Sequence, residues 1–215
     1  MLEVVNLHLL GGHIGRKGSG LCPVRGHSNV QGNRTVGIWE APSDSFIHNL
    51  ESGLNISAPR KHGYDVVNAI NAMERGDVDF LFCLGGNFIS ATPQTQRTSE
   101  AVGKISLGVH VSTKLNRSHL VQCDEMLILP CLGRTEIDIQ ESGKQFVTVE
   151  NSMGVVHTSR GGLSPASVSL RSEPWIIAEM ASSTLSESSI DFRAQVKNYD
   201  NIRDLISRCI PGFED

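Results

Sequence analysis

The chain has 215 residues, of which 39% are hydrophobic and 20% charged, and its formal net charge is −4. This balance is typical of a globular protein and excludes wholesale disorder. A weakly acidic chain without a basic run is a poor candidate for nucleic-acid binding, and no apolar stretch reaches the roughly 20 residues that span a bilayer. The five cysteines contain no C-x-x-C pair, so we expect neither a zinc site nor a disulfide framework. With no basic, apolar signal peptide at the start, we predict a cytoplasmic protein.

Residues 1–60 are expected to form a glycine-rich region. The apolar segment 1–10 has residues that could line one face of a helix, and Gly11-Gly12 ends it. Residues 11–45 are predicted to be mostly irregular because glycine recurs without any hydrophobic period. Their dense Arg, His and Asn content favours a functional loop over a linker.

From residue 64 onward, helix and strand patterns alternate. The helices carry apolar residues at intervals of three and four, whereas the strands are continuous apolar runs. In chain order we predict a helix over 64–75, a strand over 80–84, a helix over 92–102, a strand over 105–111, a short helix over 115–121 and a strand over 125–129. This order predicts an α/β fold with a doubly wound, mainly parallel, Rossmann-like sheet. Strand 80–84 is expected to be central and buried, flanked by the other two.

The helix over 92–102 is expected to begin with Thr92 as its N-cap and Pro93 as its first residue. Beyond the third strand the predicted elements are shorter or less apolar: strands over 145–149 and 155–158 around a turn at Asn151, and helices over 174–181 and 199–208. We assign residues 61–215 to one Rossmann-like α/β domain with C-terminal helices.

Glycines and polar residues follow each predicted strand of the sheet, as Gly85-Gly86-Asn87, Ser112-Thr113-Lys114 and Cys131-Leu132-Gly133-Arg134. In an open parallel sheet, ligands bind outside the carboxyl ends of the strands. Glycines let a ligand approach the backbone, while Lys114 and Arg134 add positive charge. From position alone, Gly85-Gly86 can equally be only a turn.

Several catalytic motifs are absent. Gly15-Arg16-Lys17-Gly18 does not match the phosphate-binding P-loop, and Gly85-Gly86-Asn87 lacks the full G-x-G-x-x-G of dinucleotide-binding folds. The eight histidines do not pair at four-residue spacing, so no metal-ligating residue is predicted. His110, inside a strand, is interpreted as a structural histidine.

The densest chemistry lies in residues 20–32. Arg25 could clamp a carboxylate or phosphate with its planar guanidinium. His27 could donate a hydrogen bond or relay a proton. Ser28, Asn29 and Gln31 suit recognition of a polar heterocycle. A solvated polar loop is the alternative interpretation.

This segment carries a resemblance to a known family. GGHIGRKGSGLCPVRGHSNVQGNRTVGI (11–38) resembles a stretch of the molybdopterin-guanine-dinucleotide oxidoreductases of the dimethyl-sulfoxide-reductase family, and most of all their formate-dehydrogenase-like alpha subunits. The resemblance covers essentially the whole chain and continues through GYDVVNAINAMERGDVDFLFCLGGNF, HVSTKLNRSHL, LILPCLGRTEID, VTVENSMGVVH, LRSEPWIIAEMA and YDNIRDLISRCIPGFED.

The resemblance implies a longer parent enzyme that binds molybdenum or tungsten through bis(molybdopterin guanine dinucleotide). It implies that the protein ligand to the metal and any iron–sulfur cluster lie outside this chain. The implied partners are the pterin cofactor, a small-molecule substrate and an electron-transfer protein. Isolated, the chain is expected to lack catalysis, and Cys22 is interpreted as structural.

The resemblance also assigns roles to residues. Arg25 matches an arginine that faces the metal and substrate, and His27 stands beside the pterin where formate dehydrogenases carry Gln, which counts against formate itself as the substrate. Gly85, Gly86 and Asn87 match a loop that cradles one guanosine diphosphate arm. Ser112 and Thr113 fall where many relatives place an Asp that reads guanine, so the base contact is expected to shift to Asn116 or a neighbour.

Two rival functions remain at this stage. The first is a non-catalytic nucleotide-binding or interaction module that has lost the redox site. The second is an unrelated Rossmann protein of the NAD type, against which the missing glycine fingerprint counts.

Overall fold

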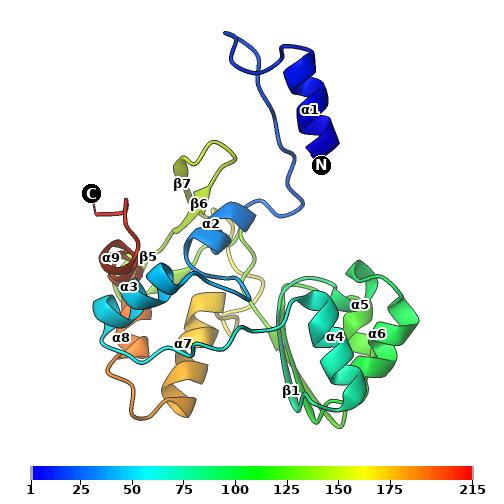
Figure 1. Cartoon of the computed structure of the whole chain (residues 1–215). Coiled ribbons are helices and arrows are strands. Elements are labelled where there is room, and N and C mark those ends of the chain that lie inside the picture. The colour runs from blue at the N-terminus through cyan, green and yellow to red at the C-terminus, as the bar shows by residue number, and fades with distance from the viewer. Residues whose placement is uncertain (1, 215) are drawn as a thin grey trace.

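The computed structural model describes residues 2–214 (Figure 1), and we divide the chain by sequence into three regions. The N-terminal region contains α1 (Leu2–Leu10), α2 (Val30–Thr35) and α3 (Asp44–Leu54). The sheet region contains α4 (Val66–Arg75), β1 (Phe80–Leu84), α5 (Phe88–Ala91), α6 (Thr95–Val102), β2 (Leu107–Ser112), the 3-10 helix η1 (Arg117–Leu120) and β3 (Glu125–Pro130). The C-terminal region contains β4 (Ile139–Gln140), β5 (Gly143–Lys144), β6 (Val147–Glu150), β7 (Val156–Ser159), α7 (Glu173–Thr184), α8 (Phe192–Lys197) and α9 (Asp200–Cys209).

The predicted α/β class and the parallel sheet are confirmed. Strands β1, β2 and β3 form one parallel sheet in that order. The prediction that β1 is central and buried is wrong, because β2 pairs on both sides and β1 is an edge strand. Phe80 and Leu84, at the two ends of β1, are each 48% exposed. A continuous apolar run shows that a strand packs against something on each face, but it does not reveal which strand has two neighbours.

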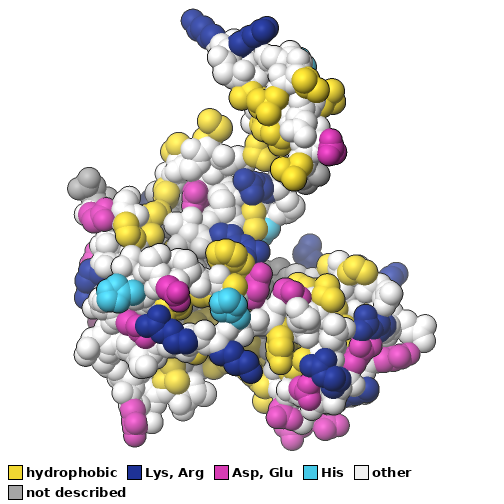
Figure 2. Space-filling view, viewed as in Figure 1, with side chains coloured by type: hydrophobic (Ala, Val, Ile, Leu, Met, Phe, Trp, Pro, Cys, Tyr) yellow, Lys and Arg dark blue, Asp and Glu magenta, His cyan; other side chains and the backbone are white. Residues whose placement is uncertain are grey.

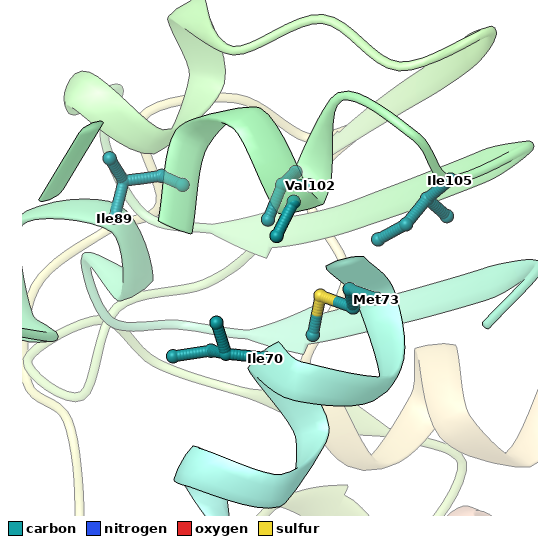
Figure 3. Close-up of a cluster of buried hydrophobic side chains, with 6 residues drawn as sticks. Ile70, Met73, Ile89, Val102 and Ile105 are labelled. Atoms are coloured by element: carbon teal, nitrogen blue, oxygen red, sulfur yellow. The ribbon is translucent and has the colours of Figure 1, made fainter. Parts of the chain in front are cut away.

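One face of the sheet is covered by helices α4, α5 and α6. Their apolar side chains meet in a closed cluster that contains Ile70, Met73, Ile89, Val102 and Ile105 (Figure 3). Helix α4 begins where Asp65 accepts a 2.8 Å hydrogen bond from the amide of Asn68, and it ends at Gly76 with φ of 76°. These two caps fix where the helix begins and ends. Its apolar residues face the sheet.

The opposite face of the sheet is covered mainly toward the carboxyl ends of the strands. There Val111 and Cys131 pack with Ile176, and Trp175 of α7 lies against the same cluster. Leu127 of β3 is 48% exposed on this face. The two faces of the sheet are therefore buried to different depths.

In the C-terminal region a small apolar cluster of Ala178, Val196 and Tyr199 is joined to the neighbouring segments by buried hydrogen bonds. The hydroxyl of Tyr199 donates to Asp138 and lies 2.7 Å from the hydroxyl of Ser172, which precedes α7. The amide of Tyr199 donates to Gln145 over 2.9 Å. Burial raises the pKa of Tyr199 well above its usual range, and the hydrogen bond to Asp138 adds to this effect. The phenol therefore stays protonated and serves as a donor.

Several local predictions need correction. Thr92 does not begin a helix: it ends α5, with its amide bonded to the carbonyl of Phe88 over 3.2 Å. Helix α6 starts later, at Thr95, after Gln94 has taken a left-handed φ of 57°. Because Pro93 fits both the end of one helix and the start of another, its position left the boundary ambiguous. The predicted helix over 115–121 is the shorter η1.

Residues 11–45 are less irregular than predicted, because α2 and the first residues of α3 are helical. Ser43 caps α3 by accepting a 3.2 Å bond from the amide of Phe46. Helix α3 packs against α9, where a Cβ added to Gly53 would lie 2.6 Å from the Cys209 sulfur. The short elements α5, α8, β4 and β5 were also not predicted. The division at residue 60 stays a prediction.

Helix α1 protrudes from the rest of the molecule (Figure 1). None of its described residues is buried, and its apolar side chains gather on the surface (Figure 2). In residues 2–214 no helix combines the length and the hydropathy that crossing a membrane requires.

Candidate functional site

The three polar strand ends lie side by side at the carboxyl edge of the sheet. The amide of Gly85 donates to the carbonyl of Val111 over 2.8 Å, and the amide of Cys131 donates to the carbonyl of Ser112 over 3.2 Å. These bonds extend the parallel ladder one residue past each outer strand. The predicted gathering of glycines and polar residues at one edge is therefore present.

Gly85 and Gly86 form an open turn. Their φ angles are 68° and 74°, a left-handed conformation that favours glycine, and no atom lies within 4 Å of a Cβ added to either residue. Among residues 2–214 the amides of Gly86 and Asn87 donate no hydrogen bond. The turn therefore presents free N–H groups beside an open space, which is the arrangement that anions bind.

Asn116 fixes this turn from the neighbouring strand end. Its side-chain nitrogen donates to the carbonyl of Gly86 over 2.7 Å, and its side-chain oxygen accepts from the amide of Ser118 over 2.9 Å. Ser118 in turn donates to the side chain of Asn87 over 3.0 Å. Ser118 was not among the residues predicted from the sequence, although Asn116 is of the residue type whose side chain accepts from the amide two positions later. Asn116 thus supports the loop, and the base contact expected of it would require this bond to open.

Ser112 and Thr113 are less engaged. The hydroxyl of Ser112 donates to the carbonyl of Lys114 over 2.8 Å. Thr113 and Lys114 are exposed. A methyl group of Thr113 would lie 3.9 Å from a Cβ on Gly133, so this side chain faces the end of β3.

Arg25 and His27 lie on the exposed segment that leads into α2. The segment is joined to the sheet edge by Arg134, whose guanidinium donates to the hydroxyl of Ser28 over 2.7 Å. His27 acts electrostatically on Glu173 at the start of α7. Within residues 2–214, the Arg25 side chain makes no hydrogen bond. The structure thus leaves both Arg25 and His27 exposed and brings His27 near Glu173 at the start of α7.

Glu173 and Cys131 are titratable groups at this edge to which the sequence pattern assigned no role. Burial raises the pKa of the Glu173 carboxyl, and the positive charge of His27 opposes the shift. Burial also raises the pKa of the Cys131 thiol to about 11, with further contributions from Glu173 and Glu136. A thiol with so high a pKa is protonated at neutral pH and is a poor nucleophile.

Asn29 and Gln31 are used within the chain. The Asn29 side chain accepts from the amide of Glu150 over 2.8 Å, and the Gln31 side chain donates to the carbonyl of Glu150. Thr35 donates to the Glu150 carboxylate over 2.9 Å. Both side chains fasten α2 to β6, whereas Oε1 of Gln31 is buried without a hydrogen-bond partner among residues 2–214. That these two amides recognise a heterocycle stays a prediction.

His110 is buried in β2 and lies away from the sheet edge. Its ring centroid is 5.0 Å from that of His119, which is also buried. Burial lowers the pKa of His110, and the charge of His119 lowers it further. The amide of Asn116 donates a 2.9 Å bond to Nδ1 of His119, and this bond holds the start of η1. In the described part of the chain no group of three His, Cys, Asp or Glu residues could hold a metal ion.

The chain has extended similarity to longer proteins. It is 49% identical over 214 residues to proteins of Mycobacterium tuberculosis and Mycobacterium bovis that are each named an uncharacterized oxidoreductase. It is 45% identical over 213 residues to protein YdeP of Escherichia coli. Each match covers 99% of this chain but only 28% of the relative. No family model matches the chain. The chain therefore spans a little over a quarter of the length of the curated relatives it matches.

Proposed function

We propose that this chain is part of an oxidoreductase and that the carboxyl edge of its sheet binds the guanine nucleotide of a molybdopterin cofactor. The oxidoreductase class is supported by the names of the mycobacterial relatives, which match almost the whole chain. The finer assignment is supported by the resemblance carried by residues 11–38 and by the open glycine turn after β1. The length of the relatives supports a site that several regions of a longer polypeptide complete.

The observation that carries this proposal is the Gly85-Gly86 turn. Two consecutive left-handed glycines with open space above them let a phosphate reach the free amides of Gly86 and Asn87. Any other residue at either glycine would be strained and would fill this space. The donor set fits a diphosphate well.

The chain offers fewer hydrogen-bonding groups for the guanine base than for the diphosphate. Ser112 and Thr113 offer hydroxyls, and a single hydroxyl cannot accept from both N–H groups of guanine as a carboxylate can. Asn116 could provide an oxygen and a nitrogen, but the nitrogen donates to Gly86 of the turn and the oxygen accepts from the amide of Ser118. We therefore infer that this chain holds mainly the diphosphate.

In the longer parent, the bound molybdenum or tungsten centre supplies two-electron redox chemistry. The chain's own residues would bind and orient. Lys114 adds positive charge near the diphosphate. Arg25 would hold an anionic or polar substrate group with its planar fork. His27, close to the Glu173 carboxyl, would donate a hydrogen bond or carry a proton beside the pterin.

Calorimetric titration of the 215-residue chain with GDP tests the nucleotide site. Because the site is incomplete, we expect weak binding, with a Kd of roughly 10 µM to 1 mM. Gly86→Val, which fills the cradle, should abolish it. Gly143→Ala is the matched control, since Gly143 also has a positive φ and open space but lies in the distant β5. Submicromolar binding would contradict the incomplete site, and no heat at millimolar GDP would contradict the nucleotide site.

The role of Arg25 is tested in the cofactor-loaded parent. Arg25→Lys keeps the charge but loses the fork, so turnover should fall about tenfold or more, which corresponds to about 1.4 kcal/mol. Arg16→Lys, in the same exposed segment, is the control. Unchanged turnover in both Arg25→Lys and Arg25→Ala, with full metal and pterin content, would remove Arg25 from the active site.

A further inference from the structure

The Glu136 carboxylate joins two segments that are distant in the sequence. One of its oxygens accepts from the amide of Gly133 over 2.6 Å, and the other accepts from the amide of Ala166 over 2.8 Å. These two bonds lower the pKa of the carboxyl below its usual range. Glu136 therefore stays ionised at neutral pH and can accept from both amides at once.

The backbone around Glu136 reinforces this connection. The carbonyl of Thr135 accepts 2.9 Å bonds from the amides of Gly162 and Leu163, and the amide of Ile137 donates to the carbonyl of Leu163 over 2.8 Å. The approach is so close that a Cβ on Gly161 would lie 1.8 Å from the carbonyl oxygen of Glu136. Residues 133–137 and 161–166 thus form one braced loop pair at the end of β3.

Arg134 lies in the middle of the braced loop, between Gly133 and Glu136. Its guanidinium is the group that holds Ser28 over 2.7 Å. Ser28 directly follows His27 in the exposed segment, and Arg25 lies just before them. The position of the braced loop therefore decides where Arg134 can hold this segment.

We propose that Glu136 is a positioning residue: by bridging the amides of Gly133 and Ala166, its carboxylate places Arg134 to hold Ser28 and so sets Arg25 and His27 relative to the carboxyl edge of the sheet. The consequence for substrate binding rests on the proposed function. The structural coupling itself requires no bound nucleotide or cofactor.

The segment is also held by a second contact that does not involve Glu136 or Arg134. Asn29 is fastened to Glu150 of β6, so the segment has one anchor at residue 28 and another at residue 29. Losing the Arg134 anchor should loosen the chain before Ser28 and leave α2 in place. The effect of Glu136 should thus be confined to residues on the N-terminal side of Ser28.

The test measures trypsin cleavage after Arg25 in the 215-residue chain. Glu136→Gln keeps one acceptor but loses the other and should accelerate this cleavage about tenfold, equivalent to about 1.4 kcal/mol. Cleavage after Lys17, farther from the anchor, should not change. Glu100→Gln is the matched control, because within residues 2–214 the Glu100 side chain accepts only from Gln96, an interaction that an amide oxygen can retain.

Arg134→Ala separates positioning from general loosening. It should accelerate cleavage after Arg25 as much as Glu136→Gln, and the double variant should be no faster than either single variant. In amide NMR spectra, Glu136→Gln should shift Gly133, Ala166 and Ser28, whereas Arg134→Ala should shift Ser28 and leave Ala166 unchanged. Additive cleavage rates, or an unchanged Ser28 signal in Glu136→Gln, would overturn the proposal. Failure of the GDP titration would count against the proposed function alone.

Discussion

The sheet region and the N-terminal segment of residues 2–29 are held in opposite ways. In the sheet region, helices α4 to α6 bury an apolar cluster together with Ile105 and Leu81 of β1. In the segment, α1 buries none of its described side chains, and the coil after it is exposed up to the hydrogen bond between Ser28 and Arg134. The residues of the proposed substrate wall thus belong to the least supported part of the chain, whereas the proposed diphosphate cradle belongs to the best supported part.

This difference explains why one half of the candidate site is held more firmly than the other. The glycine turn is built by strand ends, so its geometry follows from the sheet ladder and from Asn116. Arg25 and His27 depend on a few polar contacts at the end of their segment. The glycine turn is held within this chain, whereas Arg25 and His27 need further contacts. We expect this of a site that a longer polypeptide completes.

The largest expected effect comes from opening the apolar cluster. Ile105→Ala removes a fully buried side chain and should lower the free energy of unfolding by about 2–5 kcal/mol. Leu7→Ala in α1 is the counterpart in the segment and should change it by less than about 0.5 kcal/mol. Urea unfolding followed by circular dichroism measures both. Equal effects would abolish the distinction between the two regions.

A second substitution tests how deeply the side chains of the edge strand β1 are buried. Cys83 is half-buried, and burial raises its pKa. Cys83→Asp places an unpaired carboxylate there and should cost about 1–3 kcal/mol. Cys83→Ser is the uncharged control and should cost less. Complete unfolding by Cys83→Asp at neutral pH would indicate that β1 is buried as deeply as a central strand.

Gly161 and Gly162 offer a matched pair at the loop that supports the segment. A Cβ at Gly161 meets the backbone of Glu136, whereas a Cβ at Gly162 meets no atom within 4 Å. Gly161→Ala should therefore lower the unfolding free energy by about 1–3 kcal/mol, and it should also accelerate trypsin cleavage after Arg25. Gly162→Ala should do neither. If the two variants behave alike in thermal unfolding and proteolysis, residues 133–137 and 161–166 are not packed as described.

The smallest expected effect is a pH dependence confined to the sheet region. Because the folded-state pKa of His110 is lowered, the unfolded chain binds a proton more readily. The contribution of His110 is fully present above its ordinary value of about 6.5 and is lost as pH falls below it toward the folded-state pKa. His110→Gln should flatten unfolding free energies measured between about pH 7 and pH 5.

His62→Gln is the control for this pH dependence, because His62 is exposed in the sequence before α4. It should leave the slope unchanged. An identical slope in the wild type and in His110→Gln would assign the pH dependence to other groups.

The sequence by itself determined the parts of the molecule that depend on local pattern. The helix ending at Gly76, the three parallel strands and the polar residues after each strand were all predictable, because helical spacing, apolar runs and glycine act over a few neighbouring residues. The gathering of Gly85, Ser112 and Cys131 at one edge followed from the parallel order of the strands. The tight turn at Gly85-Gly86 was one of two interpretations that the pattern allowed.

Only the tertiary structure decided which strand is central, what Asn29, Gln31 and Asn116 bind, and how the segment meets the sheet. Each of these depends on a partner far away in the sequence, such as Glu150 for Asn29 or Arg134 for Ser28. An amide side chain looks the same in the sequence whether it binds a ligand or a backbone. Its role is decided when folding brings a specific N–H or C=O within hydrogen-bond distance, because a buried polar group must be paired.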